Sequence, residues 1–174
     1  YFNLKVLIKR VLIKFFIYRS NKETVSFNIF DNLDINKILK ERKIDLIHLH
    51  WVGGEMISLK QIANIEIPII WTLHDMWPFC GIEHFSYNKR HLKNYSKNSR
   101  NKNETGLDID RIVWAKKKEY FSKKKFNLIA PSKWMFKNVV KSEVFRNSKI
   151  YILPSILDLK KWNISNYKKI NINK

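Results

Sequence analysis

The chain contains only one cysteine, Cys80, among its 174 residues. One thiol cannot form a disulfide within the chain, and it cannot supply the ligand set of a cysteine-based zinc site. A lack of paired cysteines is typical of proteins in a reducing compartment, so we expect a cytoplasmic location. Glycine is also scarce, with four residues, and neither a GxGxxG nor a P-loop motif is present to bind phosphate groups.

Acidic residues are few: 15 Asp and Glu oppose 34 Lys and Arg, which gives a net charge of +19. Three explanations stay open. The excess of Lys, Asn and Ile together is typical of AT-rich coding sequence; alternatively, the charge attracts an anionic membrane surface or phosphate-bearing substrates. Nucleic acid is the weakest explanation, because the basic residues are scattered and no RNP, zinc-finger or helix-turn-helix signature accompanies them. We expect no nucleic-acid partner.

The sequence has no apolar run long enough to cross a membrane. Residues 4–19 predict a helix, but Lys5, Arg10 and Lys14 interrupt it, and a membrane span needs about 20 apolar residues. The order of regions that marks a signal peptide is also missing. Residues 1–20 are therefore expected to form a basic amphipathic helix, packed on a core or lying peripherally at the inner face of the cell membrane.

Hydrophobic residues make up 45% of the chain and aromatic residues 14%, which suits one globular domain with a real core. Short apolar runs predict strands at residues 44–51, 67–74, 126–132 and 149–155, and helical patterns alternate with them at 34–42, 58–65, from 108 onward and after Ser132. Continuous apolar strands are typical of a sheet covered on both faces. The order predicts a doubly wound, Rossmann-like α/β fold with a parallel sheet. The polar residues 86–106 are expected to form a long surface insertion.

Two predicted strands end in histidine. Ligands of such sheets bind beyond the carboxyl ends of the strands, where the sequence places His50 and the pair His74-Asp75. His48 and His50 should project on the same side of their strand. His74 can donate a hydrogen bond to a sugar hydroxyl or phosphate oxygen, or move a proton. Asp75 can orient His74, accept from a hydroxyl or cap the turn.

The residues around these histidines leave several interpretations open. Trp77-Pro78-Phe79 can form a stiff wall for stacking on a sugar ring, or a tightly packed turn. Gly53-Gly54 can let the backbone approach an anion. A metal site is disfavoured, because no HExxH or other tight ligand spacing is present.

Five segments resemble the N-terminal half of bacterial family-four glycosyltransferases of the capsule, exopolysaccharide and colanic-acid type. They read IDLIHLHWVGGEMISLKQI, IPIIWTLHDMWPFCGIEHFSY, IDRIVWAKKKEYF, FNLIAPSKWM and IYILPSILDLKKW, and the match runs from about residue 25 to 163. The resemblance implies one half of a GT-B fold. It implies retaining transfer of a sugar from a nucleotide-sugar donor to a glycan or lipid-linked acceptor in surface polysaccharide biosynthesis, with no metal or other cofactor.

The resemblance also assigns residues to roles. His74 matches the cleft-facing histidine of the family, Ser132 matches its strand-to-helix serine, and the acceptor side would be lined by Asp75, Trp77, Gly53, Gly54 and His50. This chain departs from the family at residues 80–85, which read CGIEHF where relatives usually carry TGGCHY.

The resemblance further implies that residues 21–163 are a partial acceptor domain and that residues 164–174 begin an interdomain linker. The donor-binding domain would lie outside this sequence, so we expect the chain alone to be inactive. An alternative function is a non-catalytic basic α/β module, a decayed transferase scaffold that binds a membrane or an anionic polymer.

Overall fold

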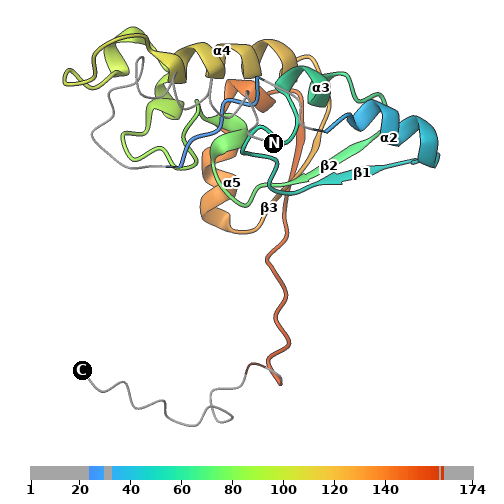
Figure 1. Cartoon of the computed structure of the whole chain (residues 1–174). Coiled ribbons are helices and arrows are strands. Elements are labelled where there is room, and N and C mark those ends of the chain that lie inside the picture. Colours follow the sequence, from blue (N-terminus) through green and yellow to red (C-terminus); the bar gives the residue numbers. More distant parts are fainter. Residues whose placement is uncertain (1–23, 30–32, 161, 163–174) are drawn as a thin grey trace, which may run out of the picture.

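The computed structural model describes residues 24–29, 33–160 and 162. The predicted amphipathic helix in residues 1–20 and the predicted linker in residues 164–174 lie outside these described residues. The described part is an α/β domain whose chain continues beyond its last strand as an extended segment (Figure 1).

Four parallel strands form one sheet in the order β1-β2-β3-β4. The strands are β1 (Ile47–Leu49), β2 (Ile69–Thr72), β3 (Asn127–Ala130) and β4 (Lys149–Ile152). Each lies inside a predicted apolar run, so the parallel Rossmann-like sheet is confirmed, with shorter strands than the apolar runs indicated. Because the strands are parallel and adjacent, all four carboxyl ends meet at one edge, where His50 and His74 follow β1 and β2.

Each α-helix begins where a short polar side chain accepts a hydrogen bond from the backbone of its first turn. The α-helices within the described residues are α2 (Ile35–Arg42), α3 (Leu59–Ala63), α4 (Ile109–Phe121) and α5 (Lys133–Val139). The four capping residues are Asp34, Ser58, Asp108 and Ser132. The predicted helix starts are therefore confirmed.

Residues alternate along the strands between a packed face and a more open one. Trp71 and Leu73 are fully buried, and α3 and α4 pack together above the sheet (Figure 1). Trp71 lies at the centre of the core, with its ring centroid 5.9 Å from that of Phe121. On the opposite face, Leu46 and Tyr151 are 47% and 50% exposed. Among the described residues the sheet is thus covered mainly on one face, whereas the apolar runs predicted cover on both.

The polar insertion at 86–106 lies largely at the surface, as predicted, and buried side chains anchor it in the domain. It contains the 3-10 helices η2 (Arg90–Lys93) and η3 (Lys97–Ser99). Tyr95 and Arg90 are buried. The Arg90 guanidinium donates to both carboxylate oxygens of Asp108, at 3.1 and 2.6 Å. A bidentate pair of this kind fixes geometry as well as charge, so the insertion has a defined position against the start of α4.

Candidate functional site

Three imidazoles lie side by side at the carboxyl ends of β1 and β2. The His50 Nδ1 atom is 2.9 Å from His74 Nε2, and the His48 and His50 ring centroids are 4.2 Å apart. The prediction that His48 and His50 share one side of their strand is confirmed. All three residues are exposed, so this histidine row (His48, His50 and His74) presents its rings to solvent at the edge where ligands of parallel sheets bind.

The hydrogen bond between His50 and His74 limits their protonation. One ring nitrogen must donate and the other must accept, so the two residues cannot both be imidazolium while the bond holds. The pKa of His48 is lowered, first by partial burial and then by the neighbouring His50 and His74. Neutral imidazoles can both donate and accept, which suits contacts with hydroxyl groups.

Asp75 contacts His84 instead of its sequence neighbour His74. Its Oδ2 atom lies 2.5 Å from His84 Nδ1, and its Oδ1 atom accepts a hydrogen bond from the Trp77 backbone N–H at 3.0 Å. Of the three roles open for Asp75, capping the turn is the one that the geometry shows. The residue that orients His74 is His50.

Of the two interpretations left open for Trp77-Pro78-Phe79, the geometry shows the tightly packed turn, because the side chains of Trp77 and Phe79 are buried. The Trp77 Nε1–H donates to the Ser26 carbonyl oxygen at 2.7 Å. The exposed indole at this site is that of Trp51, which stacks on the His84 ring at 5.6 Å. Because aromatic residues in a tight turn can either face a ligand or fill the core, the sequence did not separate these outcomes.

The glycine pair is explained by a crowded side-chain cluster. The Ser26 hydroxyl accepts from the Gly54 N–H at 2.8 Å and lies 2.9 Å from His84 Nε2. A Cβ atom on Gly53 would lie 2.7 Å from the Trp51 ring, and Gly54 has a φ of +67°, a backbone region that favours glycine. These contacts account for both glycines without a bound anion.

Ser26, His84 and Asp75 have the residue types of a hydrolase triad, but they form a brace. Ser26 is fully buried, and its hydroxyl already accepts from a backbone N–H. A nucleophile must reach its substrate, which this hydroxyl cannot do. The brace (Ser26, His84 and Asp75) ties the glycine loop to the turn that follows His74. Sequence reasoning missed Ser26, because no local spacing links it to His84.

A buried lysine holds the same turn from below. Lys117 on α4 is fully buried, and its ammonium donates to the carbonyl oxygens of Trp77, Cys80 and Gly81 at 2.5, 3.1 and 2.6 Å. Burial lowers the pKa of Lys117 to about 7. Burial and a nearby carboxyl group, that of Asp110, raise the pKa of Glu83 to about 8.

Ser132 has a structural role in the described geometry. Its hydroxyl oxygen accepts from the Met135 N–H at 3.1 Å, which caps α5 at the carboxyl end of β3. The side chain therefore lies at the same edge of the sheet as the histidine row, and its hydroxyl contacts its own helix.

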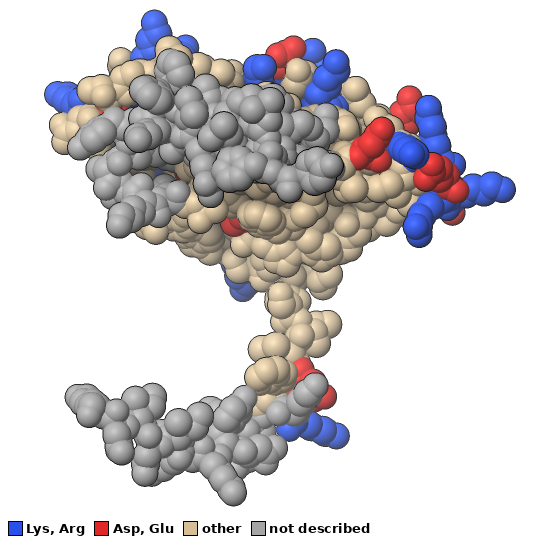
Figure 2. Space-filling view, in the orientation of Figure 1, with Lys and Arg blue, Asp and Glu red and all other residues tan. Residues whose placement is uncertain are grey.

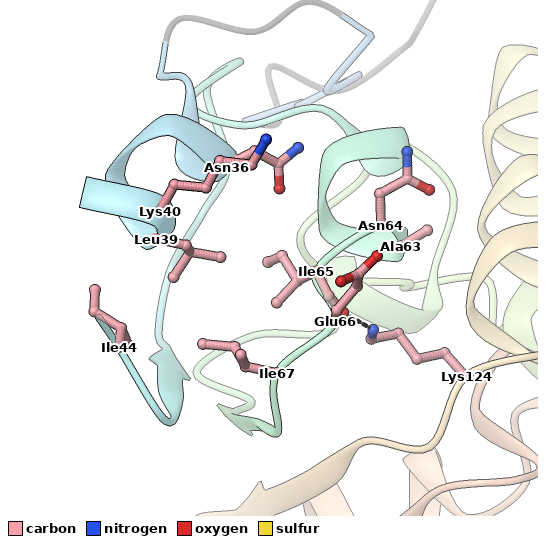
Figure 3. A pocket seen from close by; sticks show the side chains of 10 residues that line it. All are labelled: Asn36, Leu39, Lys40, Ile44, Ala63, Asn64, Ile65, Glu66, Ile67 and Lys124. Atoms are coloured by element: carbon pink, nitrogen blue, oxygen red, sulfur yellow. Dashed lines mark hydrogen bonds between the residues drawn. The ribbon is translucent and has the colours of Figure 1, made fainter. Parts of the chain in front are cut away.

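A separate cavity lies at the amino edge of the sheet (Figure 3). It has a volume of about 670 Å³ and is bordered by α2, α3 and the residues that lead into β1 and β2, with Leu39, Ile44 and Ile67 as its apolar lining. Lys124 reaches the Ile65 carbonyl at its rim (Figure 3). Because ligands of parallel sheets bind at the carboxyl edge, this cavity is not the candidate site.

Within the described ranges, no group of three or more His, Cys, Asp or Glu side chains is arranged to hold a metal ion. The residues grouped at the carboxyl edge are thus the histidine row, the brace and the exposed Trp51. Their hydrogen-bond donors and acceptors, with an indole beside them, can contact a polar ligand such as a carbohydrate.

The parallel sheet, its flanking helices and this polar edge define a Rossmann-like α/β domain, consistent with one half of a GT-B fold. The model of Glycosyltransferase Family 4 matches residues 6–161, and the chain belongs to this family. No curated protein and no solved structure matches the chain. Family membership supports glycosyl transfer as the general activity, with a sugar donor and an acceptor as substrates.

Proposed function

We propose that this chain is the acceptor-side domain of a retaining hexosyltransferase that uses a nucleotide-sugar donor. The acceptor would be a glycan or a lipid-linked sugar of surface polysaccharide biosynthesis. The single observation that carries the proposal is the histidine row, exposed at the carboxyl edge of a family-four domain. The single cysteine supports a cytoplasmic location.

His74 is the residue that we assign to substrate contact. Its Nε2 atom faces His50, so its remaining nitrogen, Nδ1, is the one to bond a sugar hydroxyl or a diphosphate oxygen. His50 acts as a positioning residue, because its hydrogen bond sets the orientation of the His74 ring. A positioned imidazole contributes about 10²–10⁴-fold when it transfers a proton in the transition state.

The remaining predicted residues shape the edge of the site. Asp75 and Trp77 hold the turn below His74, and the brace fixes the loop of Gly53 and Gly54 beside Trp51. We propose that transfer needs no metal or other cofactor. In a GT-B enzyme the nucleotide binds a second domain, and preorganised charges there would stabilise the leaving diphosphate.

The test is sugar transfer by the full protein that contains this chain, measured with a panel of radiolabelled nucleotide sugars and membrane extract as acceptor. His74→Ala should lower kcat by about a hundredfold or more while the circular dichroism spectrum is unchanged. Lys116→Ala, an exposed change on α4, is the matched control and should transfer normally. Undiminished transfer by folded His74→Ala protein would remove His74 from its role.

A second candidate is the non-catalytic basic module, which the net charge of +19 favours. The same assay separates the two candidates. If no nucleotide sugar in the panel supports transfer, yet the folded protein binds an anionic polymer such as heparin, the basic module replaces the transferase.

A further inference from the structure

Three exposed aromatic side chains contact one another near the carboxyl edge of the sheet. Phe85, Tyr87 and Trp134 are 42%, 69% and 49% exposed. The Phe85 and Trp134 rings are nearly parallel, with an interplanar angle of 3° and centroids 5.7 Å apart. Phe85 and Tyr87 have centroids 4.6 Å apart. We call these three residues the aromatic patch.

The aromatic patch is held by two segments that are tied together. Phe85 directly follows His84 of the brace, and Trp134 is in the first turn of α5. A second contact joins the same segments, because His91 Nε2 lies 3.0 Å from Asn138 Oδ1 on α5. The patch is therefore a fixed surface and not a set of independent side chains.

The surroundings of the patch carry positive charge. Lys89 lies in the first segment, and Lys133, Lys137 and Lys141 lie on α5 and just after it; all four are exposed. Residues 84–103 and 132–142 contain no Asp or Glu. The next carboxylate after α5, that of Glu143, is already paired with Lys118 at 3.0 Å.

The positive charge of both segments reaches the buried His91. The pKa of His91 is lowered first by burial, and the charges of Lys141 and Lys89 add to that effect. Both ammonium groups therefore act on the same imidazole, one from each segment. Figure 2 shows Lys and Arg side chains along the edges of the domain.

We propose that the aromatic patch and its four lysines dock the domain on an anionic lipid bilayer. Tryptophan and tyrosine favour the boundary between headgroups and acyl chains, and lysines near it are attracted to anionic headgroups. Exposed aromatic rings with a basic surround are typical of surfaces that lie in this boundary. None of the described helices is long and apolar enough to cross a membrane, and the proposed contact is peripheral.

A sugar-binding platform is the competing interpretation of stacked exposed rings. Ligand sites for polar molecules combine apolar contact with precisely placed polar groups, and the two segments offer lysines without any carboxylate. The charge pattern thus favours an anionic surface over a neutral sugar.

This docking extends the proposed function. Phe85 and Trp134 follow the site residues His84 and Ser132 by one and two positions, so the patch and the histidine row share one edge of the sheet. A domain bound to lipid by this patch would bring the row close to an acceptor carried in the bilayer. The inference rests on the proposed function only where it says that the bilayer carries the sugar acceptor. The binding of the domain to vesicles can be measured without sugar transfer.

The experiment is co-sedimentation of the full chain with phosphatidylcholine vesicles, with and without phosphatidylglycerol, at low and high salt. We expect binding only to the phosphatidylglycerol vesicles, weakened by salt because charge attraction is screened. The double variant Phe85→Ala/Trp134→Ala should weaken binding by about tenfold. Ile112→Ala, which removes an exposed side chain on α4, should bind like the wild type.

A charge-matched pair of variants separates a defined surface from diffuse attraction. Lys133→Gln/Lys137→Gln/Lys141→Gln should lose most of the binding, whereas Lys116→Gln/Lys123→Gln/Lys125→Gln removes the same charge from other exposed positions and should retain it. Equal losses in both triple variants would overturn the proposal, as would no vesicle binding by the wild type.

A fluorescence experiment tests the competing sugar platform. If a soluble oligosaccharide quenches the tryptophan fluorescence of the wild type but not of Trp134→Phe, and Trp134→Phe still binds vesicles, the patch is assigned to sugar.

Transfer to a water-soluble acceptor distinguishes the two proposals. If wild-type protein transfers sugar to that acceptor but does not bind vesicles, the docking proposal fails and the transferase stands. If it binds vesicles through the patch but transfers to no acceptor, the transferase proposal fails and the docking stands.

Discussion

The His84 imidazole is paired with the Asp75 carboxylate, with Nδ1 and Oδ2 2.5 Å apart. The His84 ring stacks with the indoles of Trp51 and Trp77, with ring centroids 5.6 and 6.3 Å apart. Its second nitrogen reaches the Ser26 hydroxyl. This one pair therefore joins the turn after β2 to the glycine loop after β1, and it fixes the edge that carries the histidine row.

Asp75→Asn should lower the free energy of unfolding by about 1–3 kcal/mol, since it weakens a charge-assisted hydrogen bond in a partly buried site. The change keeps the size of the side chain and the acceptor for the Trp77 N–H. Urea unfolding measures the loss. Asp45→Asn, an exposed carboxylate ahead of β1, is the control and should stay within about 0.5 kcal/mol of the wild type. Equal stability of both variants would show that the pair contributes nothing.

The parts of the fold that depend on local chemistry were predictable from the sequence. Asp34 and Ser132 are short polar residues directly ahead of helical patterns, and both cap helices. The apolar runs identify the four strands of the described residues, although the sheet is covered mainly on one face and β4 is largely exposed. The edge that holds His74 follows from strand direction alone.

The contacts within the site were not predictable, because they join residues far apart in the chain. Ser26 meets His84 across 58 positions, and no periodicity records such a pair. Trp77 has the same local sequence whether it faces a sugar or the core. Lys117 lies in an amphipathic helix, where a lysine usually faces solvent, and only the carbonyl groups above it show why it is buried.

Lys117→Met should lower the free energy of unfolding by about 3 kcal/mol, because the carbonyl oxygens of Trp77, Cys80 and Gly81 lose their buried ammonium donor. The Trp77 carbonyl still accepts from the Cys80 N–H. The substitution also removes the ammonium that lies 3.8 Å from the Trp77 ring centroid. Lys118→Met is the matched control, because its ion pair with Glu143 is partly exposed and worth about 1 kcal/mol or less. Chemical unfolding of both variants makes the comparison. Similar losses in the two would mean that the buried ammonium does not support the turn.

The buried His91 should make the domain lose stability in acid. Burial lowers its pKa below the ordinary 6.5, so between these two values the unfolded chain binds more protons than the folded one. Stability should therefore rise with pH through this window and fall as pH drops below about 6.5. Among the described residues the Nδ1 atom of His91 has no hydrogen-bond partner, so protonation would bury an N–H that these residues leave unpaired.

Denaturant unfolding at pH 7.5 and at pH 5, compared between wild type and His91→Gln, measures this effect; the two values bracket the ordinary pKa of histidine, about 6.5. Glu83 acts in the opposite direction, because its raised pKa makes the folded state bind more protons than the unfolded one over this range. Both proteins contain Glu83, so its contribution cancels when the stability change of the variant is subtracted from that of the wild type. The wild type should lose more stability than the variant on acidification. A variant that is equally sensitive to acid would assign the effect to other groups.

Two buried glycines should respond differently to the same added methyl group. A Cβ atom on Gly81 would lie 2.7 Å from the Cα atom of Asp110, which is backbone of α4 and cannot turn aside. A Cβ atom on Gly53 would meet side chains only: the half-exposed Trp51 ring at 2.7 Å, the Ser26 hydroxyl at 2.8 Å and the His84 ring at 3.0 Å. The Trp51 ring can move toward solvent, whereas Ser26 is buried and can give way only by a small shift within the brace.

Gly81→Ala should therefore destabilise the domain by about 3 kcal/mol, the upper range of overpacking in a filled core. Gly53→Ala should cost less, about 1–2 kcal/mol, because it meets side chains and not backbone, and it should change the fluorescence of Trp51 because that ring must move. Urea unfolding and tryptophan emission of the two variants test this contrast. If Gly53→Ala were the more destabilising change, the glycine loop and its brace would be packed more rigidly than the contact between the Gly81 turn and α4.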